Sequence, residues 1–186
     1  MPGGQRAGKI MFILDTENLI NTLKENNQTL WEYALNQEME RSGRTREELR
    51  EQMDQSLSVM ERSAQKARRE PVRSVSGLTG GNACLYEQYR QEGKSLLGEV
   101  ASLAVGMALS CSEINASMQC IVACPTAGSC GIVPAVLLAC AQSRGLDRQT
   151  LINALFTASA VGIIVGSRAT VSGAEGGCQA ECGAAA

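Results

Sequence analysis

Two glycine-rich stretches carry the residue types that could do chemistry in this chain. Residues 123–134 read ACPTAGSCGIVP, in which proline, threonine and small residues precede an apolar run of helical character. Residues 172–183 read SGAEGGCQAECG and repeat this design with a cysteine, Cys178, at the helix entrance. Loops of this kind bring backbone N–H groups to the start of a helix, where they can hold a carboxylate. The two stretches therefore predict a site for a small anionic substrate beside a metal centre.

The composition argues against several classes of function. The 17 Lys and Arg residues against 19 Asp and Glu residues give a net charge of −2, with no broad attraction for nucleic acid. One tryptophan, three tyrosines and two phenylalanines provide no platform for stacking bases. The longest apolar stretch, residues 151–165, is interrupted by polar side chains and is shorter than the roughly 20 residues of a membrane span. We therefore expect it to be a buried core helix and expect no membrane association.

Cysteine and histidine usage narrows the chemistry further. Nothing at the N-terminus resembles a signal peptide, so we expect a cytoplasmic protein whose eight cysteines are reduced. Most of them should pack as small apolar residues, and we expect Cys84, Cys111, Cys120 and Cys140 to lie in helix cores. The chain has no histidine, which removes the commonest general base and the commonest zinc ligand.

Hydrophobic periodicity and capping signals predict an all-α fold. Capping boxes at Thr29 and Thr45 start two charged helices, of which the first ends near Gly43 and the second at Pro71. Basic residues at the end of the second helix suit the helix dipole, and we favour a solvated helix end over a basic binding patch. From Ser95 onward the chain is rich in small apolar residues, and we expect helices over residues 96–123, 131–144 and 147–165.

The chain stops at Ala186, a few residues into an apolar helix, which suggests the front part of a longer protein. We expect residues 1–10 to form a disordered leader and residues 11–186 to belong to one helical domain. Charged helices would occupy residues 11–70, and an apolar helical core would occupy residues 82–186.

Four segments in this order resemble the alpha subunit of bacterial iron–sulfur-dependent L-serine dehydratase. They are SGLTGG at residues 76–81, SEINASM at 112–118, PTAGSCGIVP at 125–134 and SGAEGGCQAECG at 172–183. The resemblance covers most of this chain but only the front part of the family's alpha subunit. It implies an all-α fold with glycine-rich loops at helix N-termini forming the active site. The implied activity is the dehydration and deamination of L-serine to pyruvate and ammonia.

The resemblance also implies a 4Fe–4S cluster, held by three cysteines, with one iron open to substrate. The first ligand falls on Cys178, and the other two belong to Cys-Asp-Pro and Pro-Cys segments that the chain lacks up to Ala186. The family's Ser-Ser-Ser-His-Thr loop is also missing, so we expect a separate beta subunit and expect this chain alone to be inactive. Asn82 stands where many relatives carry aspartate, which leaves a charge-based role for that position open.

The implied mechanism sets requirements for the rest of the site. An open iron would act as a Lewis acid on the serine hydroxyl group, and a base must remove the Cα proton. The base stays undetermined, because Glu175 and Glu181 are as easily explained as first-turn helix charges. Two loops can supply fixed donors for the substrate carboxylate, and the alternative is that both are tight turns between packed helices. We favour the substrate role for the first loop and take the second loop as the second choice. The first offers Thr126, Gly128, Ser129, Cys130 and Gly131, and the second offers Ser76, Thr79 and Gly80.

Several alternatives remain at this point. Cluster-dependent L-cysteine desulfidases share related motifs, and an inactive helical scaffold would also suit a chain with one predicted ligand. A pyridoxal-phosphate enzyme would need a Schiff-base lysine, and the setting of Lys94 is polar rather than pocket-forming. A metal site formed by Cys124, Cys130 and Cys178 is a further option. Cys182, one turn after Cys178, is more simply a neighbouring or core residue.

Overall fold

The computed structural model describes residues 16–186 as a set of helices without a β-strand in that range. The all-α prediction is therefore confirmed, while the predicted leader over residues 1–10 lies outside the described residues. The elements in chain order are α1 (Thr16–Glu25), α2 (Leu30–Ser42), α3 (Arg46–Arg69), α4 (Asn82–Gln91), α5 (Glu99–Ala116), the 3-10 turn η1 (Ala127–Ser129), α6 (Ile132–Arg144), α7 (Arg148–Arg168) and α8 (Gly173–Ala185).

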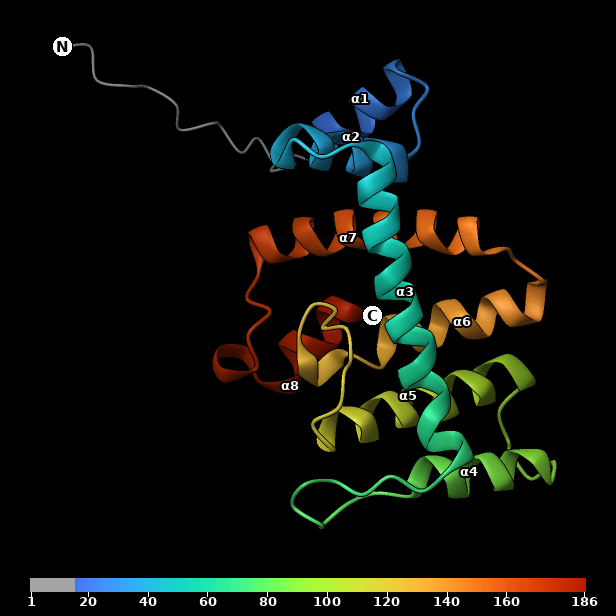
Figure 1. The fold of residues 1–186 in the computed structure, drawn as a ribbon. Helices are drawn as coiled ribbons and strands as arrows, with labels where there is room; N and C mark the ends of the chain where they lie inside the picture. Colours follow the sequence, from blue (N-terminus) through green and yellow to red (C-terminus); the bar gives the residue numbers. More distant parts are fainter. Residues whose placement is uncertain (1–15) are drawn as a thin grey trace.

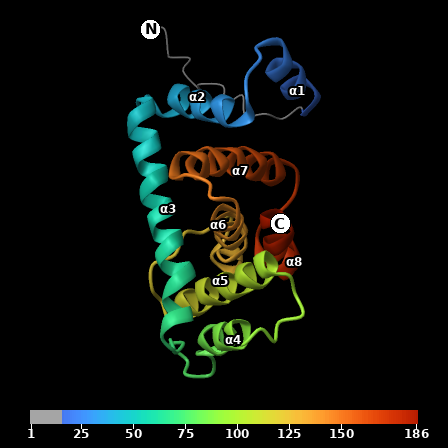
Figure 2. The same ribbon diagram turned by 90° about the vertical axis from the view of Figure 1, so that its right-hand side faces the viewer.

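The long helix α3 is the spine of the fold (Figure 1). Helices α2, α7, α6, α5 and α4 are stacked one below another along its length, as Figure 2 shows most clearly. Helix α8 lies on the side away from α3, where it packs against η1, α6 and α7. The two glycine-rich stretches are thus brought to one side of the stack.

Local signals account for the first long helices. Thr29 and Glu32 form the predicted capping box of α2, and Glu48 Oε2 accepts from the Thr45 N–H at 2.8 Å in the capping box of α3. Gly43 closes α2 with a left-handed φ of 70°, which only glycine adopts without strain. Because each of these contacts spans three or four residues, the sequence pattern was sufficient to predict them.

Two features of the apolar half differ from the sequence prediction. Helix α5 ends at Ala116 rather than near residue 123, because Met118 turns the chain with a φ of 60° and the N–H of Gln119 bonds back to Ile114 O. Helix α4 was not predicted. Its N-cap, Gly81, provides no side chain, and the side chain that caps it comes from another helix.

Helix α7 is longer than the predicted helix over residues 147–165. Its 21 residues are long and apolar enough to cross a membrane by length and composition alone, and its most apolar window is 28% buried in the fold. The core helix of a water-soluble protein meets the same criteria, so length and composition do not separate the two cases. Buried residues of α7, including Ile152 and Leu155, belong to the main core.

The main core fills the space between α3 and the helices stacked on it. Its fully or nearly fully buried members include Leu35, Leu57, Cys111, Ala139 and Ile152. Small residues let α3 and α5 approach closely, and the Ser110 hydroxyl donates to Ser63 O at 2.6 Å and accepts from Ala67 N at 3.0 Å. The Ser110 side chain of α5 thereby bridges a carbonyl group and an N–H group of the α3 backbone.

We expect Leu57→Ala to lower the free energy of unfolding by about 2–5 kcal/mol, because Leu57 is 1% exposed and its removal leaves a cavity. The matched control is Leu85→Ala on α4, whose side chain is 64% exposed and whose loss should cost less than about 0.5 kcal/mol. Chemical denaturation followed by circular dichroism measures both. Equal effects of the two substitutions would contradict this description of the core.

Candidate active site

The first predicted substrate loop forms the η1 turn and the start of α6. The buried Ser129 hydroxyl donates to Cys124 O at 3.2 Å and pairs with the Thr126 hydroxyl at 3.2 Å. The N–H groups of Ser129 and Cys130 are also engaged, with Thr126 O and Ala127 O as acceptors. The N–H of Gly131 has no acceptor among the hydrogen bonds of the described residues. Of the predicted donors, Ser129 and Cys130 therefore shape the turn, and the N–H of Gly131 is left without an acceptor at a residue that is itself buried.

The second predicted loop is an exposed turn closed by its own hydrogen bonds. Ser74 N donates to Thr79 O at 2.9 Å, and the Thr79 N–H donates to Ser74 Oγ at 3.2 Å. Ser76 Oγ lies 3.1 Å from Ser74 Oγ. Gly80 has a φ of 137°, and a methyl group built on it would lie 2.2 Å from Val72 O, so the turn requires glycine there.

The last turns of α5 tie both loops to the core, through two residues to which the sequence analysis gave no role. Glu113 Oε1 accepts from the N–H groups of Asn82 and Ala83 at 2.6 and 3.2 Å, and so caps α4 directly after the second loop. Asn115 Nδ2 donates to Ala127 O in η1 at 3.0 Å. A glutamate in an otherwise apolar helix was the sequence signal for this arrangement, because a buried carboxylate needs hydrogen-bond donors.

Helix α8 contains the predicted metal ligand. It is kinked at Gly177, whose φ of 68° and ψ of −171° are not helical, so Cys178 is the first residue after the kink. The Cys178 thiol is exposed and its sulfur lies 3.4 Å from that of Cys182. No group of three or more metal-ligating side chains occurs within residues 16–186. Two adjacent accessible thiols fit part of the soft ligand set that iron–sulfur clusters use, with the remaining ligands to come from elsewhere.

The two acidic residues near Cys178 have different surroundings. The exposed Glu175 accepts from the Thr170 hydroxyl at 2.6 Å. Glu181 is partly buried, and its carboxylate lies against both η1 and the start of α8. A methyl group built on Gly128 would lie 2.6 Å from Glu181 Oε2, and one built on Gly173 would lie 2.8 Å from the same atom. The structure therefore brings Cys178, Glu181 and the η1 turn into one neighbourhood.

The other thiols are mostly shielded from solvent. Burial raises the pKa of both Cys111 and Cys124 to about 11, and burial also raises the pKa of Cys130. Cys124, Cys130 and Cys178 do not form a group that could hold a metal ion within the described residues, which argues against the three-cysteine site. The prediction that Cys120 lies in a helix core is wrong, because it is exposed in the segment between α5 and η1.

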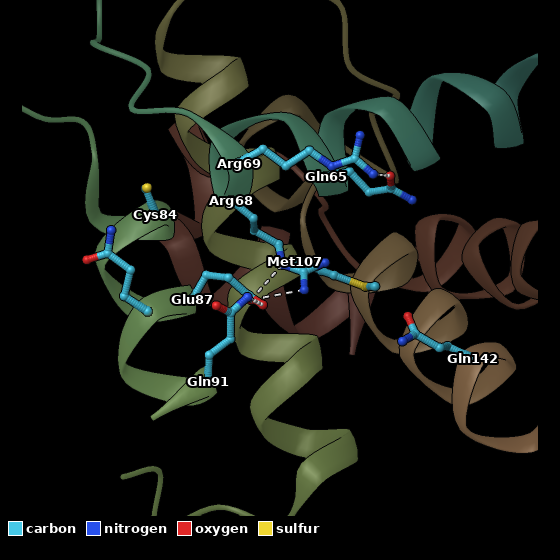
Figure 3. Close-up of a pocket in the computed structure, with 9 residues that line it drawn as sticks. Gln65, Arg68, Arg69, Cys84, Glu87, Gln91, Met107 and Gln142 are labelled. Atoms are coloured by element: carbon cyan, nitrogen blue, oxygen red, sulfur yellow. Dashed lines mark hydrogen bonds and ion pairs between the residues drawn. The ribbon is translucent and has the colours of Figure 1, made fainter. Parts of the chain in front are cut away.

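A separate polar depression lies between α3, α4, α5 and α6 (Figure 3). Glu87 lies in its wall, 2.9 Å from Arg68 Nη2 and 2.7 Å from Arg90 Nη2. Burial alone would raise the pKa of Glu87, but the hydrogen bonds from Arg90 and Arg68 outweigh it and lower the pKa. The solvated end predicted for α3 is therefore wrong for Arg68, which is a largely buried partner of α4 rather than a free surface charge.

The family model and the similar curated proteins that we compared with this chain point to the same family. The family model for the serine dehydratase alpha chain matches residues 25–186. The chain belongs to the serine dehydratase alpha chain family. It is 44% identical over 171 residues to a probable L-serine dehydratase alpha chain of Bacillus subtilis (strain 168), and 40% identical over 167 residues to an L-serine dehydratase alpha chain of Peptoniphilus asaccharolyticus.

These alignments cover 92% and 90% of this chain, and 57% of each relative. The chain therefore spans somewhat more than half the length of these serine dehydratase alpha chains. No solved structure matches it. The residues that match the family model include helices α2 to α8 of this serine dehydratase alpha chain family member. Both glycine-rich stretches and Cys178 therefore lie within the matched part.

We expect Gly131→Ala to destabilise the fold by about 1–3 kcal/mol, because the new methyl group would lie 2.8 Å from Ala108 O on the backbone of α5. Gly162→Ala is the matched control. Nothing lies within 4 Å of a methyl group there, so the helix-favouring substitution should stabilise α7 by up to about 1 kcal/mol. If the melting temperatures of both variants shifted in the same direction, this would contradict the packing of the start of α6 on α5.

Thiol labelling tests the burial of the cysteines. In the cluster-free protein at pH 8, iodoacetamide should modify the exposed Cys120 and Cys178 first and leave Cys111 and Cys124 largely unmodified. A pKa of about 11 leaves about one thiol in a thousand ionised at pH 8, and this fraction rises about tenfold at pH 9. Peptide mass spectrometry measures each site, and labelling of Cys111 as fast as Cys120 would be inconsistent with this structure.

Proposed function

We propose that this chain acts in an L-serine dehydratase, as the front part of its alpha subunit. The reaction removes the β-hydroxyl group and the Cα proton of L-serine as water. The resulting enamine tautomerises to an imine, and hydrolysis of the imine yields pyruvate and ammonia. The observation that carries the proposal is the exposed Cys178 thiol, which follows the kink in α8, the helix that packs on the glycine-lined η1 turn.

The donor set is compatible with an iron–sulfur cluster. We propose Cys178 as one ligand of a 4Fe–4S cluster, with two further cysteines from outside the described residues. When bound, the cluster supplies a Lewis acid for the hydroxyl group of the substrate. The accessible thiol of Cys178 suits this role because a bound substrate must reach the same point, and the buried Cys111 and Cys130 do not meet that requirement.

The chain itself positions the substrate carboxylate. The first turn of α6 offers the N–H groups of Ile132 and Val133, which have no helical acceptor, and the Gly131 N–H directly precedes them. Pro134 has no N–H, and the N–H of Ala135 donates to Gly131 O. The Asn115 amide anchors Ala127 O, so the turn that presents these donors is held on α5. Preorganised donors of this kind bind a carboxylate without the cost of ordering a loop.

We further propose a beta chain as the partner. The names of the relatives as alpha chains support this, and so does the absence of histidine from the sequence, which leaves the chain without the commonest proton-transfer group. The exposed 74–79 turn is available for contact with such a partner.

The test is anaerobic pyruvate formation from L-serine by the natural alpha chain co-expressed with its beta chain. We expect activity that an iron chelator abolishes. Cys178→Ala should lower the iron content and reduce activity by at least about tenfold, because a metal ligand is lost. Cys120→Ala, also exposed but outside α8, is the matched control and should leave both unchanged.

Chelator-resistant pyruvate formation would contradict the cluster proposal. Faster sulfide release from L-cysteine than pyruvate formation from L-serine would instead assign the protein to cysteine desulfidation. Iron loading without activity on either amino acid would favour a different small β-substituted substrate.

A further inference from the structure

The carboxylate of Glu181 fills a gap between two glycines that lie far apart in the sequence. Gly128 belongs to η1 and Gly173 starts α8, and a methyl group built on either would collide with the Glu181 carboxylate. The absence of side chains at these two positions is therefore what makes room for the carboxylate. Helix α8 packs on η1 at this point.

Glu181 differs from the other acidic residues near the glycine-rich loops in having no partner. Glu175 accepts from Thr170, and Glu113 accepts from two N–H groups of α4 through Oε1, while its Oε2 is buried without a partner. No hydrogen bond or ion pair reaches Glu181 from any residue in 16–186. Its two oxygens are not among the buried side-chain atoms without a partner, so they remain open to water or to a ligand. A positively charged donor is the strongest partner that a ligand can offer a carboxylate. A ligand with a cationic group therefore matches this position.

The position of Glu181 relative to Cys178 suggests which ligand that is. The two residues are three apart in the part of α8 after the kink, so their side chains project from the same face of the helix. The Gly128 contact places the carboxylate at the η1 turn, directly before the first-turn donors of α6. An anionic group held by those donors and a cationic group held by Glu181 would belong to one small zwitterion.

We propose that Glu181 binds the α-ammonium group of the amino-acid substrate and makes the site select amino acids over hydroxy acids of the same shape. This inference rests on the proposed function, which it extends from reaction type to substrate recognition. A charge-assisted hydrogen bond between ammonium and carboxylate is stronger than a neutral one, so an analogue without the ammonium group loses it and leaves Glu181 unpaired.

The test measures equilibrium binding as well as turnover, in the cluster-loaded complex with the beta chain. L-Alanine and L-lactate are the probes, because they differ in an ammonium against a hydroxyl group and neither carries the β-hydroxyl leaving group. We expect the wild-type complex to prefer L-alanine by about tenfold or more. Glu181→Gln should remove this preference and raise KM for L-serine by a similar factor, with a smaller change in kcat.

Glu175→Gln is the matched control, since it removes the same charge from the same helix where the carboxylate is exposed and bonded to Thr170. It should keep the preference for L-alanine. Gly173→Ala is a second route to the same effect, because its methyl group would displace the Glu181 carboxylate. Iron content and melting temperature check that each variant is folded and loaded.

A wild-type complex without preference for L-alanine, or a preference that survives in both Glu181→Gln and Gly173→Ala, would overturn the inference. A fall in kcat at unchanged KM, with a larger isotope effect from L-serine deuterated at Cα, would overturn it in favour of proton abstraction by Glu181. Failure of the proposed function can be distinguished from failure of this inference. If the proposed function is wrong, the wild-type complex forms no pyruvate from L-serine, regardless of whether it prefers L-alanine over L-lactate.

Discussion

The close crossing of α3 and α5 is the contact on which the rest of the structure depends. It is possible because Ser63, Ala64 and Ala67 on one helix face Ser110 and Cys111 on the other. Ser110 both donates to and accepts from the α3 backbone, so its buried hydroxyl is fully used rather than a cost. Since α5 also carries Glu113 and Asn115, this crossing fixes where both glycine-rich loops are held.

The loops differ in what holds them and in what they leave free. The second loop is closed by hydrogen bonds of its own and attached through the capped start of α4. The first loop uses the Ser129 hydroxyl for its internal bonds and leaves backbone donors at the start of α6. A loop whose shape is maintained by buried side-chain bonds keeps its remaining donors in place, which is the property that an anion site requires.

Burial separates the cysteines into two groups with different chemistry. Cys111, Cys124 and Cys130 lie in or against the core, where burial disfavours the thiolate and leaves them as apolar packing residues. Cys178 lies after a kink in a helix on the periphery of the stack, with Cys182 beside it. All these cysteines carry the same thiol group. The difference in their expected thiol reactivity therefore comes from where each cysteine lies in the stack of helices.

Contacts within one or two helical turns were readable in the sequence, and contacts between distant segments were not. The capping boxes of α2 and α3, the stop at Gly43 and the all-α class each follow from residues within four positions of one another. The start of α4 depends on a carboxylate 31 residues away, and the early end of α5 depends on a backbone turn at Met118. Glu175 and Glu181 looked equivalent in the sequence. Only the packing of α8 on η1 separates them, because the space that receives Glu181 is bounded by glycines that folding alone brings together.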